Sequence, residues 1–230
     1  MTGNLTSRRS SHKIVWTTNH FAVYLTIMKS VFDPSFQNDD VPSKIVFALE
    51  RLSQVFRINL WRENKKHGLS PLQIQVLLFL LYQPADHKRI SSLAREFNMT
   101  KATISQAVGV LEEKAYLARK VDPLDSRSAV LYLTTRGEQV AREVSLFAND
   151  LRQYLLAVDD QDQETVLTAL LTLIHKLQLE GHISPQRMCF TCRHFVKSTA
   201  ESSPHYCQLM AKPLAHSDLR LNCLEHTPVP

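Results

Sequence analysis

Apolar residues recur at three- and four-residue spacings through the middle of the chain, which predicts amphipathic helices. In the first such segment the apolar positions are Ile45, Leu49, Leu52, Val55, Phe56 and Leu60. The segment ends in Lys65-Lys66-His67-Gly68. Cations favour the carboxyl end of a helix, and glycine can adopt the left-handed capping conformation. We therefore predict one long helix within residues 42–70.

A second helix is predicted after Ser70, which can cap it, with Pro71 in its first turn. Its buried stripe consists of Ile74, Leu77, Leu78 and Leu81, and Pro84 ends it. Two shorter helices follow, at about Ile90–Phe97 and Lys101–Lys114, and the short segment between them ends in Thr100, a good cap. This spacing is typical of a helix-turn-helix. The apolar positions that would pack the pair against the preceding helix are Leu93, Ala94, Phe97, Ile104, Val108 and Leu111.

The pattern changes after Ala115 to an alternation of apolar and polar residues, which predicts a two-stranded hairpin. Turn-forming residues fill 122–127, so we expect these residues to form the exposed tip, or wing. A long helix is then predicted to begin at Thr134-Thr135-Arg136-Gly137 and to run through about Val158. Another helix, capped by Asp159-Asp160, is predicted to run to about Gly181.

This order of elements resembles the MarR family of bacterial regulators over roughly residues 42–180. The family's wing motif is matched by Asp125-Ser126-Arg127 followed by an apolar strand, and its Leu-Thr-x-x-Gly junction by Leu133-Thr134-Thr135-Arg136-Gly137. The resemblance implies a mainly α fold, with a winged helix-turn-helix at 71–134 that binds DNA. It also implies a homodimer whose platform is built from the helix in 42–70 and the dimerisation helices in 135–181.

The resemblance further implies a roughly palindromic operator, repression as the commoner mode of regulation, and a small-molecule effector bound between platform and winged helix. A dimer places two recognition helices about one DNA turn apart, which is why the operator should be pseudo-palindromic. The residues do not identify such an effector.

The second helix of the helix-turn-helix carries small polar side chains that can enter the major groove. They are Lys101, Thr103, Ser105 and Gln106. Thr100 and Lys101 lie at the helix start, where free amides favour phosphate, and Gln106 could read an adenine edge. The alternative is an ordinary solvated face.

Basic residues around this helix are candidates for contacts to the DNA backbone. Arg127 is expected to enter the minor groove with Asp125 holding its side chain, the alternative being a surface ion pair. Phosphate contacts are expected from Lys88, Arg89, Arg119 and Lys120. From residue 88 to 127 there are eight Lys or Arg against five Asp or Glu. That small excess supports DNA binding without deciding it.

The whole chain has a net charge of +5, a modest excess that favours polyanions. Residues 1–41 are interpreted as an amino-terminal arm that is loosely ordered, or whose first part precedes a true start at Met28. Without residues 1–27 the net charge falls to +2, because Arg8, Arg9 and Lys13 are lost. The sequence has no apolar run of about 18 residues and no secretory signal. We therefore expect a cytoplasmic protein with no membrane partner.

Four cysteines are confined to the tail at 182–230. Cys189 and Cys192 form a C-x2-C knuckle. Cys207 follows after fourteen intervening residues, and Cys223 after another fifteen. Four thiolates are a complete ligand set for Zn²⁺ or an iron–sulfur cluster. A unit of about 40 residues generally needs such a staple to fold.

The metal is left open between an iron–sulfur cluster, of the 4Fe–4S type, and zinc. Structural zinc sites usually have two knuckles, whereas this tail has one, which favours the cluster. A cluster would make the protein a sensor whose operator binding depends on the site, since its loss changes charge and local folding. Zinc would be structural, in a regulator that responds to a small molecule. His194, His205 or His226 could each replace a cysteine, and four unligated thiols on a flexible extension are the remaining alternative.

An enzyme is the competing class, with Cys189 and Cys192 as a thiol–disulfide couple. Such motifs normally begin a helix in a strand–helix pattern, which is absent from the sequence here. No phosphate loop or nucleophile elbow offers another reaction. The sequence thus predicts a non-enzymatic regulator, with an interaction adaptor that has lost DNA binding as a further alternative.

Overall fold

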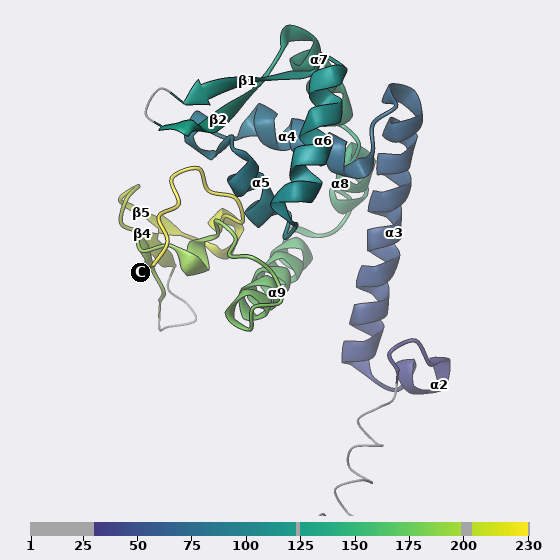
Figure 1. The fold of residues 1–230 in the computed structure, drawn as a ribbon. Helices are drawn as coiled ribbons and strands as arrows, with labels where there is room; N and C mark the ends of the chain where they lie inside the picture. Colours follow the sequence, from purple (N-terminus) through teal and green to yellow (C-terminus); the bar gives the residue numbers. More distant parts are fainter. Residues whose placement is uncertain (1–29, 123–124, 199–203, 230) are drawn as a thin grey trace, which may run out of the picture. The chain divides into compact units, whose positions relative to one another are not determined.

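The computed structural model describes residues 30–122, 125–198 and 204–229, with the side chains of 122 and 125–128 left undescribed. Figure 1 shows the order of the elements along the chain. The chain forms two compact units, which divide between Val55 and Phe56. The predicted basic arm at 1–27 lies outside the described residues. No helix in the described ranges is long and apolar enough to cross a membrane.

The first unit contains a short helix, α2 (Pro34–Gln37), and the beginning of α3 (Val41–His67). Placing residues 34–37 in a loosely ordered arm was wrong: the Asp33 carboxylate accepts a hydrogen bond from the Ser35 amide, and Pro34 occupies the first turn. Asp40 supports the start of α3 in the same way, because its carboxylate accepts from the amide of the buried Ser43 at 2.8 Å.

The second unit contains the end of α3 and the winged helix. Gly68 follows α3 with a φ of 63°, as its capping role predicted. Helix α4 (Pro71–Tyr82) begins in a capping box of Ser70 and Gln73, and a 3-10 turn, η1 (Ala85–His87), follows it. The predicted cap at Ser70 is therefore confirmed.

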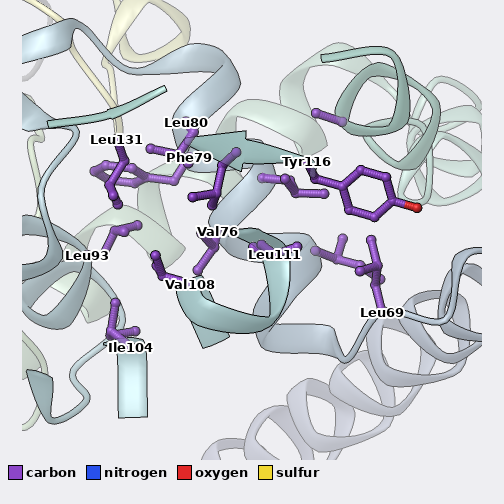
Figure 2. Packing of buried hydrophobic residues seen from close by; sticks show 14 of the residues in the cluster. Leu69, Val76, Phe79, Leu80, Leu93, Ile104, Val108, Leu111, Tyr116 and Leu131 are labelled. Atoms are coloured by element: carbon purple, nitrogen blue, oxygen red, sulfur yellow. The ribbon is translucent and has the colours of Figure 1, made fainter. Parts of the chain in front are cut away.

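The helix-turn-helix consists of α5 (Ile90–Glu96) and α6 (Lys101–Glu113). Asn98 turns the chain between them with a φ of 51°, and the Thr100 hydroxyl accepts a hydrogen bond from the Thr103 amide at 3.1 Å. The six apolar positions predicted on these two helices pack with α4 in one core, and of the six Phe97 is the one that is partly exposed. Figure 2 shows side chains from this core, including Leu93, Ile104, Val108 and Leu111.

The wing is an antiparallel hairpin of β1 (Leu117–Asp122) and β2 (Asp125–Leu133), with Leu117 paired to Leu133. The strands reach further than predicted, because Asp122 pairs with Asp125 and residues 126 and 127 belong to β2 rather than to a loop at 122–127. The Leu131 amide also donates to the Lys88 carbonyl at 2.8 Å, which ties the hairpin to the segment before α5.

The helix predicted from 134 to about 158 is interrupted. It consists of α7 (Thr135–Val144) and α8 (Asn149–Leu155), separated by turns. The Ser145 hydroxyl donates to the Arg142 carbonyl, and the buried Asn59 donates its side-chain amide to the Phe147 carbonyl at 3.0 Å. These bonds satisfy backbone groups at the break, so the single long helix was wrong.

Helix α9 (Asp160–Leu179) begins at Asp159, whose carboxylate accepts from the Gln161 amide. The tail after it is folded. Its short elements are η2 (Cys189–Thr191), β3 (Phe195–Val196), β4 (His205–Cys207), β5 (Lys212–Leu214) and η3 (His216–Asp218). The sheet order is β3-β4-β5, and a second small core joins Leu171 of α9 to Met188 and Leu219. The described part of the tail is therefore folded, in contrast to the alternative of a flexible extension.

Candidate nucleic-acid interface and cysteine cavity

Helix α6 separates its polar and apolar side chains onto opposite faces. Ile104, Val108 and Leu111 are completely buried, whereas Lys101, Thr103 and Gln106 are exposed and Ser105 is partly exposed. The exposed Thr100 lies at the start of this face, with its hydroxyl 2.9 Å from that of Thr103. The sequence thus selected residues that the structure brings together on one accessible surface.

Two of the candidate phosphate-binding residues, Arg119 and Lys120, already have partners within the protein. Arg119 Nε lies 2.8 Å from Glu112 Oε2, an ion pair that links β1 to α6. Lys120 Nζ lies 5.2 Å from the centre of the Tyr132 ring on the neighbouring strand. This ion pair therefore links the first strand of the wing to α6.

Lys88 and Arg89 lie in the segment that joins η1 to α5, and both are partly buried. Burial lowers the pKa of the Lys88 ammonium, and the nearby Glu138 opposes that shift. Asp125 and Arg127 belong to β2, near the tip of the hairpin, but their side chains lie outside what the structure describes.

All four cysteines line one cavity of about 30 Å³ in the tail. Cys189 comes from η2 and Cys192 directly follows it, Cys207 ends β4, and Cys223 lies in the last loop. Pairing between β3 and β4 places Cys207 opposite Phe195, which brings a distant cysteine back to the knuckle. The sheet of the tail thus helps bring the four cysteines to one cavity, whereas their role as metal ligands stays a prediction.

Backbone and side-chain N–H groups point at two of the sulfurs. The Arg220 amide lies 3.2 Å from Cys189 Sγ, and Arg220 Nη1 lies 3.8 Å from Cys223 Sγ. Burial raises the pKa of the Cys189 thiol, the hydrogen bond from the Arg220 amide lowers it, and the proximity of the other three cysteines raises it further. Arg220 is a residue that the sequence reasoning missed.

The four cysteines share one cavity but do not form a preformed metal site. Within the described ranges, no set of three or more His, Cys, Asp or Glu side chains has the arrangement of a site for a metal ion. Of the three candidate histidines, His194 lines the cavity. His205 accepts a hydrogen bond from the Ser198 amide, and His226 Nε2 lies 3.0 Å from the Thr191 hydroxyl.

Arg187, two residues before Cys189, reaches from the tail to the helix-turn-helix. Its Nη1 lies 2.8 Å from His87 Nδ1, its Nη2 lies 3.5 Å from Glu96 Oε2, and its guanidinium carbon lies 5.9 Å from the centre of the Phe79 ring. The sequence offered only a weak signal for this residue, a cation beside a cysteine knuckle, because its partners lie about a hundred residues away.

Comparisons with known proteins agree with this architecture. Residues 67–128 match the model of the MarR family. The chain is 28% identical over 109 residues to the uncharacterised HTH-type transcriptional regulator YkoM of Bacillus subtilis, an alignment that covers 46% of this chain and 70% of YkoM. It is 29% identical over 94 residues to the HTH-type transcriptional regulator MhqR of the same organism, covering 41% of this chain and 63% of MhqR.

Among solved structures, the Staphylococcus aureus MepR–DNA complex is similar with a TM-score of 0.51 and 20% identity, over 57% of this chain and 96% of that chain. MepR in its DNA-binding conformation gives the same TM-score at 19% identity, over 58% of this chain and 98% of that one. At such identity the likeness concerns the fold, which is mainly helical with two small sheets. Residues 67–128 are therefore similar to the MarR family, and the fold resembles that of the solved winged-helix structures.

Proposed function

We propose that this protein is a transcriptional regulator that binds duplex DNA sequence-specifically through α6 and the wing. The observation that carries the proposal is the exposed polar face of α6, held by a capped amino terminus and a buried apolar face. An α-helix with small polar side chains fits the major groove, which is about 12 Å wide. The similarity to transcriptional regulators YkoM and MhqR supports this reading.

Each predicted contact has a defined part in this proposal. Gln106 reads a base edge, while Thr100 and Lys101 bind phosphate at the helix start. Arg127 enters the minor groove beside Asp125, and the remaining basic residues contact phosphates. As in the family it resembles, the protein acts as a repressor.

The regulator is proposed to act as a homodimer on a pseudo-palindromic operator. Apolar side chains on α3 are exposed in the single chain, among them Ile45, Leu52 and Trp61, and Val166 and Leu173 are exposed on α9. Leu52→Glu should therefore shift the protein toward monomer in sedimentation velocity. Ser53→Glu, which adds the same charge to the same helix at a polar position, should leave the dimer intact; an unchanged Leu52→Glu dimer would contradict the role of α3.

The DNA-binding proposal is tested by selecting an operator from a random duplex library with the full chain, then measuring affinity by fluorescence anisotropy. Lys101→Ala combined with Arg127→Ala should weaken binding and reduce the slope of log K against log salt by about 0.9 per lost phosphate contact. Lys176→Ala with Arg193→Ala removes the same charge elsewhere and should change little. Unchanged operator affinity in the first double variant would sink the proposed contacts.

We also propose that the cysteine cavity binds metal through Cys189, Cys192, Cys207 and Cys223, as a 4Fe–4S cluster or Zn²⁺, and that occupancy modulates operator binding. The presence of one C-x2-C knuckle favours the cluster, because structural zinc sites usually have two. A single zinc draws all four thiolates to about 2.3 Å from one centre, whereas in a cubane each cysteine binds a different iron.

Anaerobic purification followed by an absorption spectrum and metal and sulfide analysis tests the cofactor. Brown protein with iron and acid-labile sulfide supports the cluster, and colourless protein with one zinc per chain supports a structural site in a regulator that responds to a small molecule. Cys207→Ser should lower the metal content, while Asn222→Ala, at an exposed position beside Cys223, should not. Metal-free wild-type protein would contradict both forms of the site.

A thiol–disulfide enzyme is less well supported by the same residues. Burial raises the pKa of the Cys189 thiol, whereas redox-active dithiols depend on a lowered one. The relatives found are transcriptional regulators rather than enzymes.

A further inference from the structure

We propose that Arg187 couples occupancy of the cysteine cavity to the helix-turn-helix, so that loading the tail with metal holds α5 and α6 in the geometry that binds DNA. The inference rests on the proposed DNA binding and on the proposed metal site. It adds Arg187 as the residue through which the metal site acts on DNA binding.

The backbone of Arg187 is fixed by the cysteine cavity. Its carbonyl accepts a hydrogen bond from the Cys223 amide at 2.8 Å, and the Cys189 amide donates to the Arg220 carbonyl at 3.0 Å. Met188, between Arg187 and Cys189, is buried in the small core that joins the tail to α9. A metal that draws Cys189 and Cys223 together therefore also fixes the chain at Arg187.

The side chain of Arg187 is fixed by the winged helix. It is 13% exposed, and its three partners come from three different elements: Phe79 from α4, His87 from η1 and Glu96 from α5. Because an arginine guanidinium only donates, His87 Nδ1 must accept, which places the ring proton on Nε2, 3.6 Å from the Asp86 carboxylate. One tail residue thus contacts each of the three elements that directly precede the recognition helix.

These contacts reach the position of α6 through packing. Phe79 meets Phe97, at the end of α5, edge to face with ring centres 6.0 Å apart. A second contact lies at the following turn, where the Ser184 hydroxyl is 3.5 Å from Asn98 Oδ1. Thus the segment that leads into the cavity touches both the last turn of α5 and the turn that orients α6.

Loss of the metal removes the constraint on Cys223 and Cys189, and with it the backbone anchor of Arg187. Glu96, whose side chain is 30% exposed, then loses its guanidinium partner, and a partly buried ion pair that is broken on one side is unfavourable. We therefore expect the metal-free protein to have a less ordered α5 and a weaker affinity for its operator.

The test compares metal-loaded and metal-free full-length protein, using the selected operator and the metal found on purification. In wild-type protein, removing the metal should weaken operator binding by about tenfold, within the usual range of coupling between sites. In Arg187→Gln the metal content should be retained, but the ratio of loaded to free affinity should fall below about twofold. Arg193→Gln, an exposed arginine beside Cys192, is the matched control and should keep the wild-type ratio.

Glu96→Gln provides a second test that leaves the tail unchanged. It should also reduce the ratio of operator affinities of the metal-loaded and metal-free protein. Hydrogen exchange supplies a readout that needs no DNA: metal removal should speed exchange in residues 90–97 of the wild-type protein but not in Arg187→Gln.

Operator affinity that is independent of metal in the wild-type protein, or full metal dependence in both Arg187→Gln and Glu96→Gln, would overturn the coupling while leaving DNA binding in place. A wild-type chain that binds no operator would instead refute the proposed function itself.

Discussion

Gly137 lies against the carbonyl group of Tyr116, so closely that a Cβ at position 137 would overlap the carbonyl oxygen and carbon. The same carbonyl accepts a hydrogen bond from the Thr134 amide at 3.0 Å. The Thr134 hydroxyl donates to the Ala115 carbonyl at 2.7 Å and accepts from the Gly137 amide at 3.0 Å. The Leu-Thr-x-x-Gly motif therefore links the end of the wing and the start of α7 to the turn between α6 and β1.

Replacing Gly137 with alanine should destabilise the protein by at least about 2 kcal/mol, because backbone rather than a flexible side chain blocks the new methyl group. Urea unfolding followed by circular dichroism measures the loss. Gly109→Ala is the matched control: it lies in α6 with nothing within 4 Å of a new Cβ, and it should stabilise the helix by about 0.5–1 kcal/mol. Equal effects of the two substitutions would contradict the close approach at Tyr116.

Gln106 should contribute to sequence preference more than to nonspecific affinity. If its amide reads an adenine, Gln106→Ala will weaken operator binding by about 1–3 kcal/mol and relax selectivity at one base pair in each half-site. Binding to the operator and to single-base variants, measured at fixed salt, checks this. Gln75→Ala, an exposed glutamine on α4, should have no such effect; a uniform loss on every sequence would mean that Gln106 contacts only the backbone.

Several helix starts could be predicted closely from sequence because helix caps are local. Ser70, Thr100 and Asp159 cap their helices with side chains that bond to amides two or three residues away. The break between α7 and α8 could not be predicted from local sequence. The Phe147 carbonyl at this break accepts a hydrogen bond from Asn59, which lies 88 positions earlier in the chain. The cysteines of the tail were readable from their spacing, but the strands that gather them are only two or three residues long.

Removing the Asn59 amide should destabilise the break between α7 and α8. Asn59→Ala leaves the partly buried Phe147 carbonyl without its donor, which costs about 1–3 kcal/mol. Chemical denaturation gives the free energy, and hydrogen exchange in residues 145–149 should rise most. Asn149→Ala, an exposed asparagine beside the break, serves as the control. A loss as large in the control would show that the Asn59 bond is not what supports the break.

Asp40 gives a prediction about pH. The Ser43 hydroxyl and amide both donate to its carboxylate and hold its pKa below the ordinary value of 3.8. Because the folded-state pKa lies below the unfolded one, the contribution to stability is complete above about pH 4 and is lost as the pH falls through the folded-state pKa. Asp40→Asn keeps a capping group without a titratable proton, so its deficit in unfolding free energy relative to wild type should shrink as the pH falls below about 4.

The carboxyl carbon resonance of Asp40 measures its pKa directly. Ser43→Ala removes the hydroxyl donor and should move the Asp40 midpoint upward, toward 3.8. Ser53→Ala is the control, because the hydroxyl of Ser53 donates to the Glu50 carbonyl further along the same helix. An Asp40 midpoint that is the same in wild type and Ser43→Ala would assign the lowered pKa to the Ser43 amide alone, and a wild-type midpoint at or above 3.8 would contradict the capping bonds at the start of α3.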